Sequence, residues 1–130
     1  MDNKHPFDLE ERTTIFAQNV IHCCVKMSRN PINDSLIRQV VRSAGSVGAN
    51  YREANDALGA KDFVMRLRIS RKEAKETFHW LCLLRTAVPD RNDQVSALIK
   101  ESLELKDILS AMLRNAKDNR RDQLGEVWVR

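Results

Sequence analysis

The chain has few residues that interrupt helices or cross-link a protein: three prolines, four glycines and three cysteines among 130 residues. The cysteines, Cys23, Cys24 and Cys82, are odd in number and two are adjacent, so the sequence implies no disulfide framework and favours a reducing compartment. No apolar run approaches the roughly 20 residues that cross a bilayer, and the first residues do not resemble a signal peptide. We therefore expect a soluble, cytoplasmic protein with no membrane association.

Leu, Ala, Arg, Lys and Glu are abundant, and hydrophobic residues recur at spacings of three and four, as in amphipathic helices. Asp8 followed by Glu11 is typical of a helix start, whereas Asn30-Pro31 and Val88-Pro89 are interpreted as helix stops. The pattern predicts helices at about residues 8–29, 34–56, 61–87 and 92–119. Four long helices with short connections alternate in direction, so the predicted fold class is all-α. We expect an antiparallel up-down-up-down four-helix bundle as a single domain over residues 1–130.

Residues 125–130, which include Trp128, have too few apolar side chains to fold alone. A weakly ordered terminus is one expectation, and docking on a partner is the other.

Residues 43–49 form a run of small side chains that includes Gly45 and Gly48. Each glycine costs up to about 1 kcal/mol relative to alanine in a helix, which suggests that the small side chains serve a purpose. They allow a neighbouring helix to approach closely, either inside the bundle or across a subunit interface.

The sequence contains no signature of an activated nucleophile, no phosphate-binding glycine loop and no zinc-ligand spacing. Glu76 and His79 have the Glu-x-x-His spacing of bundle di-iron proteins, but such sites need a second copy, and only one exists here. We therefore expect no catalytic residues, no metal and no cofactor, and we predict that the protein is not an enzyme.

The net charge of +4 is concentrated in residues 60–88, which hold seven basic and three acidic residues. At 100° per residue, the basic residues gather on one outer arc of the third predicted helix, and we predict that they bind RNA or DNA through phosphates. The predicted nucleic-acid-binding stripe consists of Lys61, Arg68, Arg71, Lys72 and Lys75. The alternative is a solvated face whose basic side chains pair with nearby acids. No aromatic residue interrupts the stripe, which argues against base stacking.

An adjoining arc of the same helix combines apolar and acidic residues and would leave apolar area exposed on a monomer. Another subunit can cover it. The predicted oligomer interface comprises Met65, Ile69, Glu73 and Glu76.

Two segments carry a family resemblance: Arg42-Ser43-Ala44-Gly45-Ser46-Val47-Gly48-Ala49-Asn50 followed by Glu53, and Lys61-Asp62-Phe63 leading into Leu67, Ile69, Glu73 and Glu76. They resemble the bacterial four helix bundle proteins related to those encoded by intervening sequences in 23S ribosomal RNA genes. Asn50-Tyr51-Arg52-Glu53-Ala54 departs from the Asn-Ile-Ala-Glu-Gly of many members, which indicates a divergent branch.

The resemblance implies a homo-oligomeric ring, commonly a homopentamer, and some relatives are nucleic-acid-binding accessory proteins of the reverse transcriptase of diversity-generating retroelements. Carried over by position, Arg42, Asn50 and Glu53 are interpreted as a structural polar set, buried or interfacial. Two functions remain open: a nucleic-acid-associated accessory protein, or a structural oligomer that binds a protein partner.

Overall fold

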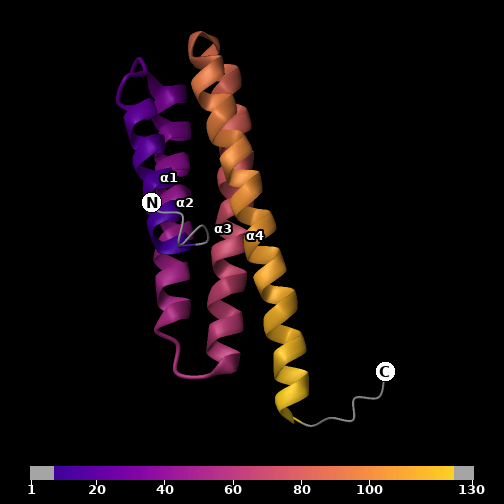
Figure 1. The fold of residues 1–130 in the computed structure, drawn as a ribbon. Helices are drawn as coiled ribbons and strands as arrows, with labels where there is room; N and C mark the ends of the chain where they lie inside the picture. The colour runs from indigo at the N-terminus through magenta and orange to yellow at the C-terminus, as the bar shows by residue number, and fades with distance from the viewer. Residues whose placement is uncertain (1–7, 125–130) are drawn as a thin grey trace.

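The computed structural model describes the backbone of residues 8–124 and the side chains of residues 8–116. Four α-helices lie side by side, α1 (Leu9–Cys24), α2 (Pro31–Asn55), α3 (Ala60–Ala87) and α4 (Asn92–Leu124), with a short 3-10 turn, η1 (Pro89–Arg91), before the last (Figure 1). Each helix packs on the next one along the chain, and α4 returns to α1. The predicted all-α, antiparallel four-helix arrangement is confirmed.

The first helix starts where predicted and ends earlier. The Asp8 carboxylate accepts the Glu11 amide at 3.4 Å, which caps the start of α1. The prediction that this helix continues to residue 29 is wrong, because α1 ends at Cys24. There the amide of Met27 bonds the carbonyl of Cys24 three residues back, and this tighter turn brings the Met27 side chain into the core.

The start of the second helix also differs from the prediction of residue 34. Asn30-Pro31, interpreted as a stop, begins α2: the Asn30 side chain accepts the Asn33 amide at 2.8 Å, and Pro31 occupies the first helical position. Proline fits there because the first amides of a helix have no intrahelical partner. The dipeptide therefore starts α2, and α1 has already ended at Cys24.

The other helix limits lie close to those expected. The third helix matches to one residue, whereas α4 runs to Leu124, five residues beyond the predicted end at 119. The predicted behaviour of the segment around Trp128 lies outside the described residues.

The core consists almost entirely of the side chains that the helical spacing predicts. Phe16, Val47, Leu67, Leu81 and Leu105 are at most 1% exposed. Four residues at these spacings are only partly buried: Leu36, Phe63, Met112 and Ala116.

The small-residue run packs inside the bundle at Gly48. A Cβ at this position would lie 2.7 Å from Thr13 Oγ1 on α1, so α1 and α2 can pack this closely only without a side chain there. Gly45 has no such neighbour within 4 Å. On the other side of α2, buried hydroxyls join it to α3: Ser70 donates to the carbonyl of Val47 at 2.7 Å. Of the two explanations for the run, packing within the chain holds at Gly48.

No helix in the described part of the chain has the length and apolar character that crossing a membrane requires.

Candidate nucleic-acid interface

The basic stripe lies on the outer face of α3 because the opposite face is buried. Leu67, Ala74 and Leu81 are fully buried, so residues half a turn away from them are directed outward. Of the stripe, Lys61, Arg68, Lys72 and Lys75 are exposed, and only Arg71 is partly buried. The Arg71 guanidinium donates to Ser110 Oγ on α4 at 3.4 Å, which holds it at the α3–α4 edge.

No carboxylate among residues 8–116 forms an ion pair with any member of the stripe. Several arginines elsewhere behave differently: Arg12, Arg29, Arg42 and Arg52 each pair with at least one acid. The pairing with nearby acids that the alternative interpretation expects is absent among these residues, whereas the exposure of the stripe is that of a solvated face. Within the described side chains, five positive charges of α3 therefore have no carboxylate partner.

Four members of the stripe meet in one shallow depression of about 420 Å³ on α3, which we call the α3 depression. Its lining consists of Arg68, Arg71, Lys72, Lys75, Glu76, His79 and Trp80. Lys61 lies outside it, about 10 Å nearer the start of the helix at 1.5 Å per residue. The structure thus brings together four of the five predicted residues.

His79 and Trp80 are the site residues that sequence reasoning missed. Their rings meet edge to face, with centroids 5.0 Å apart and planes at 66°. His79 is exposed, whereas the Trp80 indole nitrogen is buried without a hydrogen-bond acceptor among the described residues. No aromatic residue lies between Arg68 and Lys75 of the stripe, but His79 follows its last member, and a spacing of four residues places it beside Lys75.

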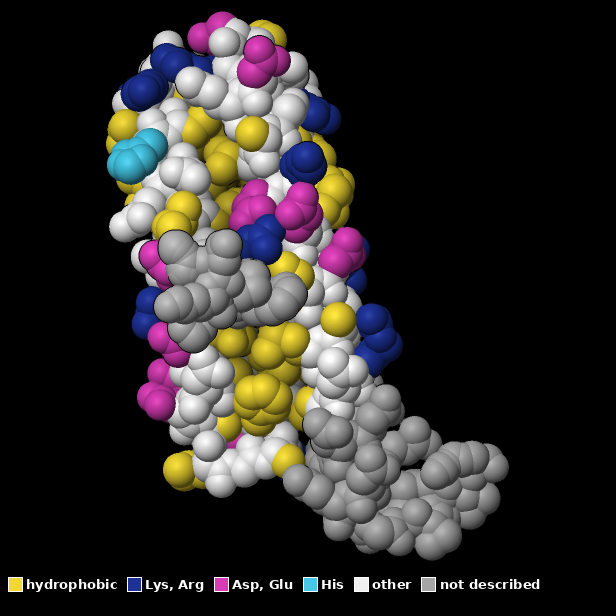
Figure 2. All heavy atoms as spheres, viewed as in Figure 1, with side chains coloured by type: hydrophobic (Ala, Val, Ile, Leu, Met, Phe, Trp, Pro, Cys, Tyr) yellow, Lys and Arg dark blue, Asp and Glu magenta, His cyan; other side chains and the backbone are white. Residues whose placement is uncertain are grey.

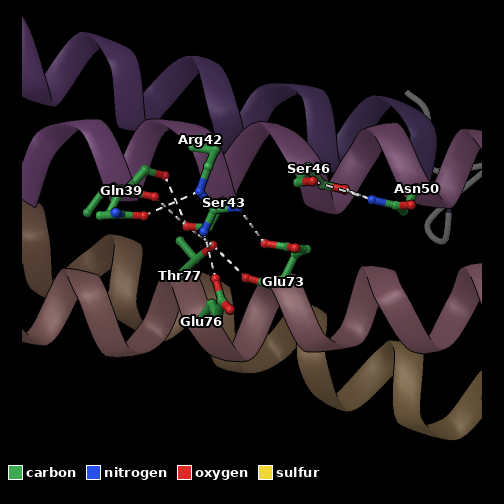
Figure 3. A network of polar contacts seen from close by, with 9 residues as sticks. Gln39, Arg42, Ser43, Ser46, Asn50, Glu73, Glu76 and Thr77 are labelled. Atoms are coloured by element: carbon green, nitrogen blue, oxygen red, sulfur yellow. Dashed lines mark hydrogen bonds and ion pairs between the residues drawn. The ribbon is translucent and has the colours of Figure 1, made fainter.

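Two acids border the stripe, and both are bound by an arginine of α2 (Figure 3). Arg42 Nη2 donates to Glu76 Oε1 at 2.7 Å, and its Nη1 donates to Glu73 Oε1 at 3.3 Å. The hydrogen bond that Arg42 donates to the Glu76 carboxylate raises the pKa of Arg42. Arg42 thus offsets part of the negative charge beside the α3 depression.

The predicted structural polar set, Arg42, Asn50 and Glu53, does not form one connected hydrogen-bond network. Asn50 donates to the carbonyl of Ser46 at 2.9 Å, and its Oδ1 accepts from Arg66 Nη1 at 3.3 Å, so it links α2 to α3. Glu53 is exposed, and its side chain makes no hydrogen bond or ion pair within residues 8–116. The Arg42 side chain is 49% exposed, so this set lies at the surface and not in the core.

The predicted oligomer interface is exposed to different degrees. Met65 is 47% exposed, and Ile69 is partly buried. Glu73 and Glu76 already bind Arg42, so within one chain they close the α2–α3 edge. A role for these four residues between subunits stays a prediction.

The Glu-x-x-His pair does not form a metal-ligand group in the described part of the chain. Glu76 binds Arg42, and the His79 ring packs against Trp80. No cluster of three or more His, Cys, Asp or Glu side chains suited to a metal occurs among the described residues.

A larger groove of about 620 Å³ runs between α1 and α4, where Figure 2 shows hydrophobic side chains along the furrow between the helix pairs. Arg12 crosses this edge and binds Glu101 at 2.8 Å and Glu104 at 2.9 Å. Cys23 lies in the same groove, and burial raises the pKa of its thiol. This groove carries no concentration of positive charge comparable to that on α3.

The fold and the α3 face define a class: antiparallel four-helix bundle proteins with a segregated basic surface. Residues 8–111 match the model of the 23S rRNA-intervening sequence protein family, and the chain belongs to this family. The resemblance seen in the sequence is therefore confirmed.

A solved structure supports the same assignment. It is a protein of unknown function of the S23 ribosomal protein family from Bacteroides thetaiotaomicron, 29% identical, with a TM-score of 0.71. The match covers 80% of this chain and 96% of that one. No curated protein matches the chain.

Proposed function

We propose that this protein is a non-enzymatic, oligomeric accessory factor that binds nucleic acid through the basic stripe of α3. The observation that carries the proposal is the unpaired state of this stripe. Five cations gather on one helix face without a carboxylate partner among residues 8–116, and four of them line one depression. Clustered like charges raise the local positive potential, which attracts an external anion such as a phosphate.

Phosphate binding on such a surface is driven by the release of condensed counterions. Each neutralised phosphate contributes about −0.7 to −0.9 to the slope of log affinity against log salt. Four lysine and arginine side chains in the α3 depression therefore predict a slope of about −2.8 to −3.6 for each engaged subunit.

Oligomerisation multiplies this effect. The family resemblance implies a homopentamer and, for some relatives, association with a reverse transcriptase. A ring repeats the same stripe on each subunit, and binding by one stripe raises the effective concentration of the next. Weak contacts on single subunits then add to a useful affinity.

The test measures binding of the purified protein to labelled RNA and DNA over a range of salt concentrations. A variant with Arg68→Glu, Lys72→Glu and Lys75→Glu should lose binding while keeping its helical circular dichroism. The matched control reverses three exposed basic residues on other faces, Lys26, Arg38 and Lys100, and should change affinity far less. No binding at low salt, or equal losses in the two variants, contradicts the proposal.

A second variant tests the arrangement without touching the stripe. Arg42→Ala releases the carboxylates of Glu73 and Glu76 beside the α3 depression. Affinity should fall and the salt dependence should weaken, because two negative charges now oppose each bound phosphate. Unchanged binding indicates that the α3 depression is not the contact surface.

The second candidate function is an oligomer that binds a protein partner, and the exposure of Met65 favours it. In this case Met65→Asp or Ile69→Asp dissociates the oligomer measured by light scattering, and charge reversal in the stripe has no effect on binding to the partner. Only the first candidate function predicts salt-sensitive binding to nucleic acid, so this measurement distinguishes the two.

A further inference from the structure

The α3 depression combines two kinds of chemistry that phosphate binding alone does not require. Its cationic part is formed by Arg68, Arg71, Lys72 and Lys75, and its far end is aromatic, formed by His79 and Trp80. Positive charge binds any phosphate backbone, whereas a ring at the surface offers a stacking partner for a base. The junction of the two distinguishes this site from a general basic face.

We infer that the α3 depression binds single-stranded nucleic acid, with the backbone along the cations and one base stacked on the exposed ring of His79. The inference rests on the proposed function and narrows its ligand class. Trp80 is a positioning residue, because its edge-to-face contact at 5.0 Å holds the imidazole in one orientation. The His79 side chain is exposed, so its ring is accessible to a base.

The spacing along the helix suits an extended strand. Arg68, Lys72, Lys75 and His79 follow one another at intervals of four, three and four residues, which correspond to about 6, 4.5 and 6 Å along the axis. Phosphates can therefore occupy the cations in sequence, and the next base reaches His79. In a duplex the bases already stack on one another inside the helix, so none is available to His79 without being flipped out.

The charges around the aromatic end favour a base over a further phosphate. Glu76 lines the α3 depression beside His79, and Arg42 holds its carboxylate at 2.7 Å. Arg42 offsets this charge but is not part of the lining, and beyond Lys75 the lining contains no further lysine or arginine. A neutral, planar group fits this end better than an anion does.

The experiment compares three ligands of equal phosphate number at one low salt concentration: an oligothymidine, the same strand with abasic sites throughout, and a duplex. The wild-type protein should bind the oligothymidine roughly tenfold more tightly than the abasic strand, the size expected for one stacked base. His79→Ala should remove this difference and leave the affinity for the abasic strand unchanged. His22→Ala, an exposed histidine on α1, is the matched control and should retain the difference.

Fluorescence supplies a second, independent readout. In a Trp128→Phe background Trp80 is the remaining tryptophan, and the oligothymidine should quench its emission while the abasic strand should not. Equal, salt-sensitive affinity for both strands overturns the stacking inference and leaves the proposed function standing. Tighter binding of the duplex than of the oligothymidine also overturns it. Failure of all three ligands to bind overturns the proposed function as well.

Discussion

Replacing Gly48 by alanine should destabilise the bundle, whereas the same replacement at Gly45 should stabilise it. Both glycines lie within α2, three residues apart, so the helix gains equally from alanine at either position, by about 1 kcal/mol. The difference lies in the space around them. A Cβ on Gly48 meets Thr13 Oγ1 at 2.7 Å and Thr13 Cβ at 3.1 Å, whereas a Cβ on Gly45 meets nothing within 4 Å.

The expected size of the effect follows from the stiffness of Thr13. This side chain is β-branched and 1% exposed, and its hydroxyl donates to the carbonyl of Leu9 at 2.6 Å, so it cannot rotate away freely. Crowding of this kind costs about 1–3 kcal/mol. After the gain in helix propensity, Gly48→Ala should be about 1 kcal/mol less stable than wild type and about 2 kcal/mol less stable than Gly45→Ala.

Urea unfolding followed by circular dichroism measures the free energy of unfolding of both variants. In thermal unfolding, each 1 kcal/mol corresponds to a change of about 4 °C in Tm for a domain of this size. Thr13→Ala combined with Gly48→Ala should recover part of the loss, because it removes the atom at 2.7 Å. Equal stability of the Gly45→Ala and Gly48→Ala proteins would refute the close approach of α1 and α2.

Three further predictions concern the ends and edges of the bundle. Asn30→Ala should lower the free energy of unfolding by about 1 kcal/mol in denaturant titration, because the cap at the start of α2 is lost. Burial raises the pKa of the Cys24 thiol to about 11, so at pH 8 a thiol-specific reagent should label the more accessible Cys82 first; rapid labelling of Cys24 contradicts its burial. A double-mutant cycle between Arg12 and Glu101 should give a coupling of about 0.5–1 kcal/mol that decreases with added salt, since both side chains are about one third exposed.

The helices and their buried faces are predictable from the sequence because a single physical rule governs them. Apolar residues at spacings of three and four must share one face of a helix, and burial of that face determines which side of each helix packs in the core. Helix ends are less predictable, because one signal can have two meanings. Asn30-Pro31 disfavours the continuation of a preceding helix and equally favours the start of a following one. Only the hydrogen bond from the Met27 amide to the Cys24 carbonyl, three residues back, shows that α1 ends earlier.

Part of the candidate site is likewise predictable from the sequence, and part is not. The exposure of the cations follows from the helical wheel, and the sequence therefore predicts the stripe. The pairing of Arg42 with Glu76 joins residues 34 apart in sequence, and no local pattern specifies it. Trp80 lies on an adjoining arc of α3, and only the orientation of its side chain toward His79 brings the aromatic pair to the α3 depression.

The cations of the α3 depression come from one uninterrupted helix, which has mechanical consequences for any ligand. A helix that packs on α2 and α4 over its length cannot bend to follow a curved surface, and the distances between its charges are fixed by the helical rise. All adaptation must come from the bound molecule or from the lysine and arginine stems. The α3 depression is therefore a rigid binding surface, and a flexible ligand can match the spacing of its charges better than a stiff ligand of equal charge.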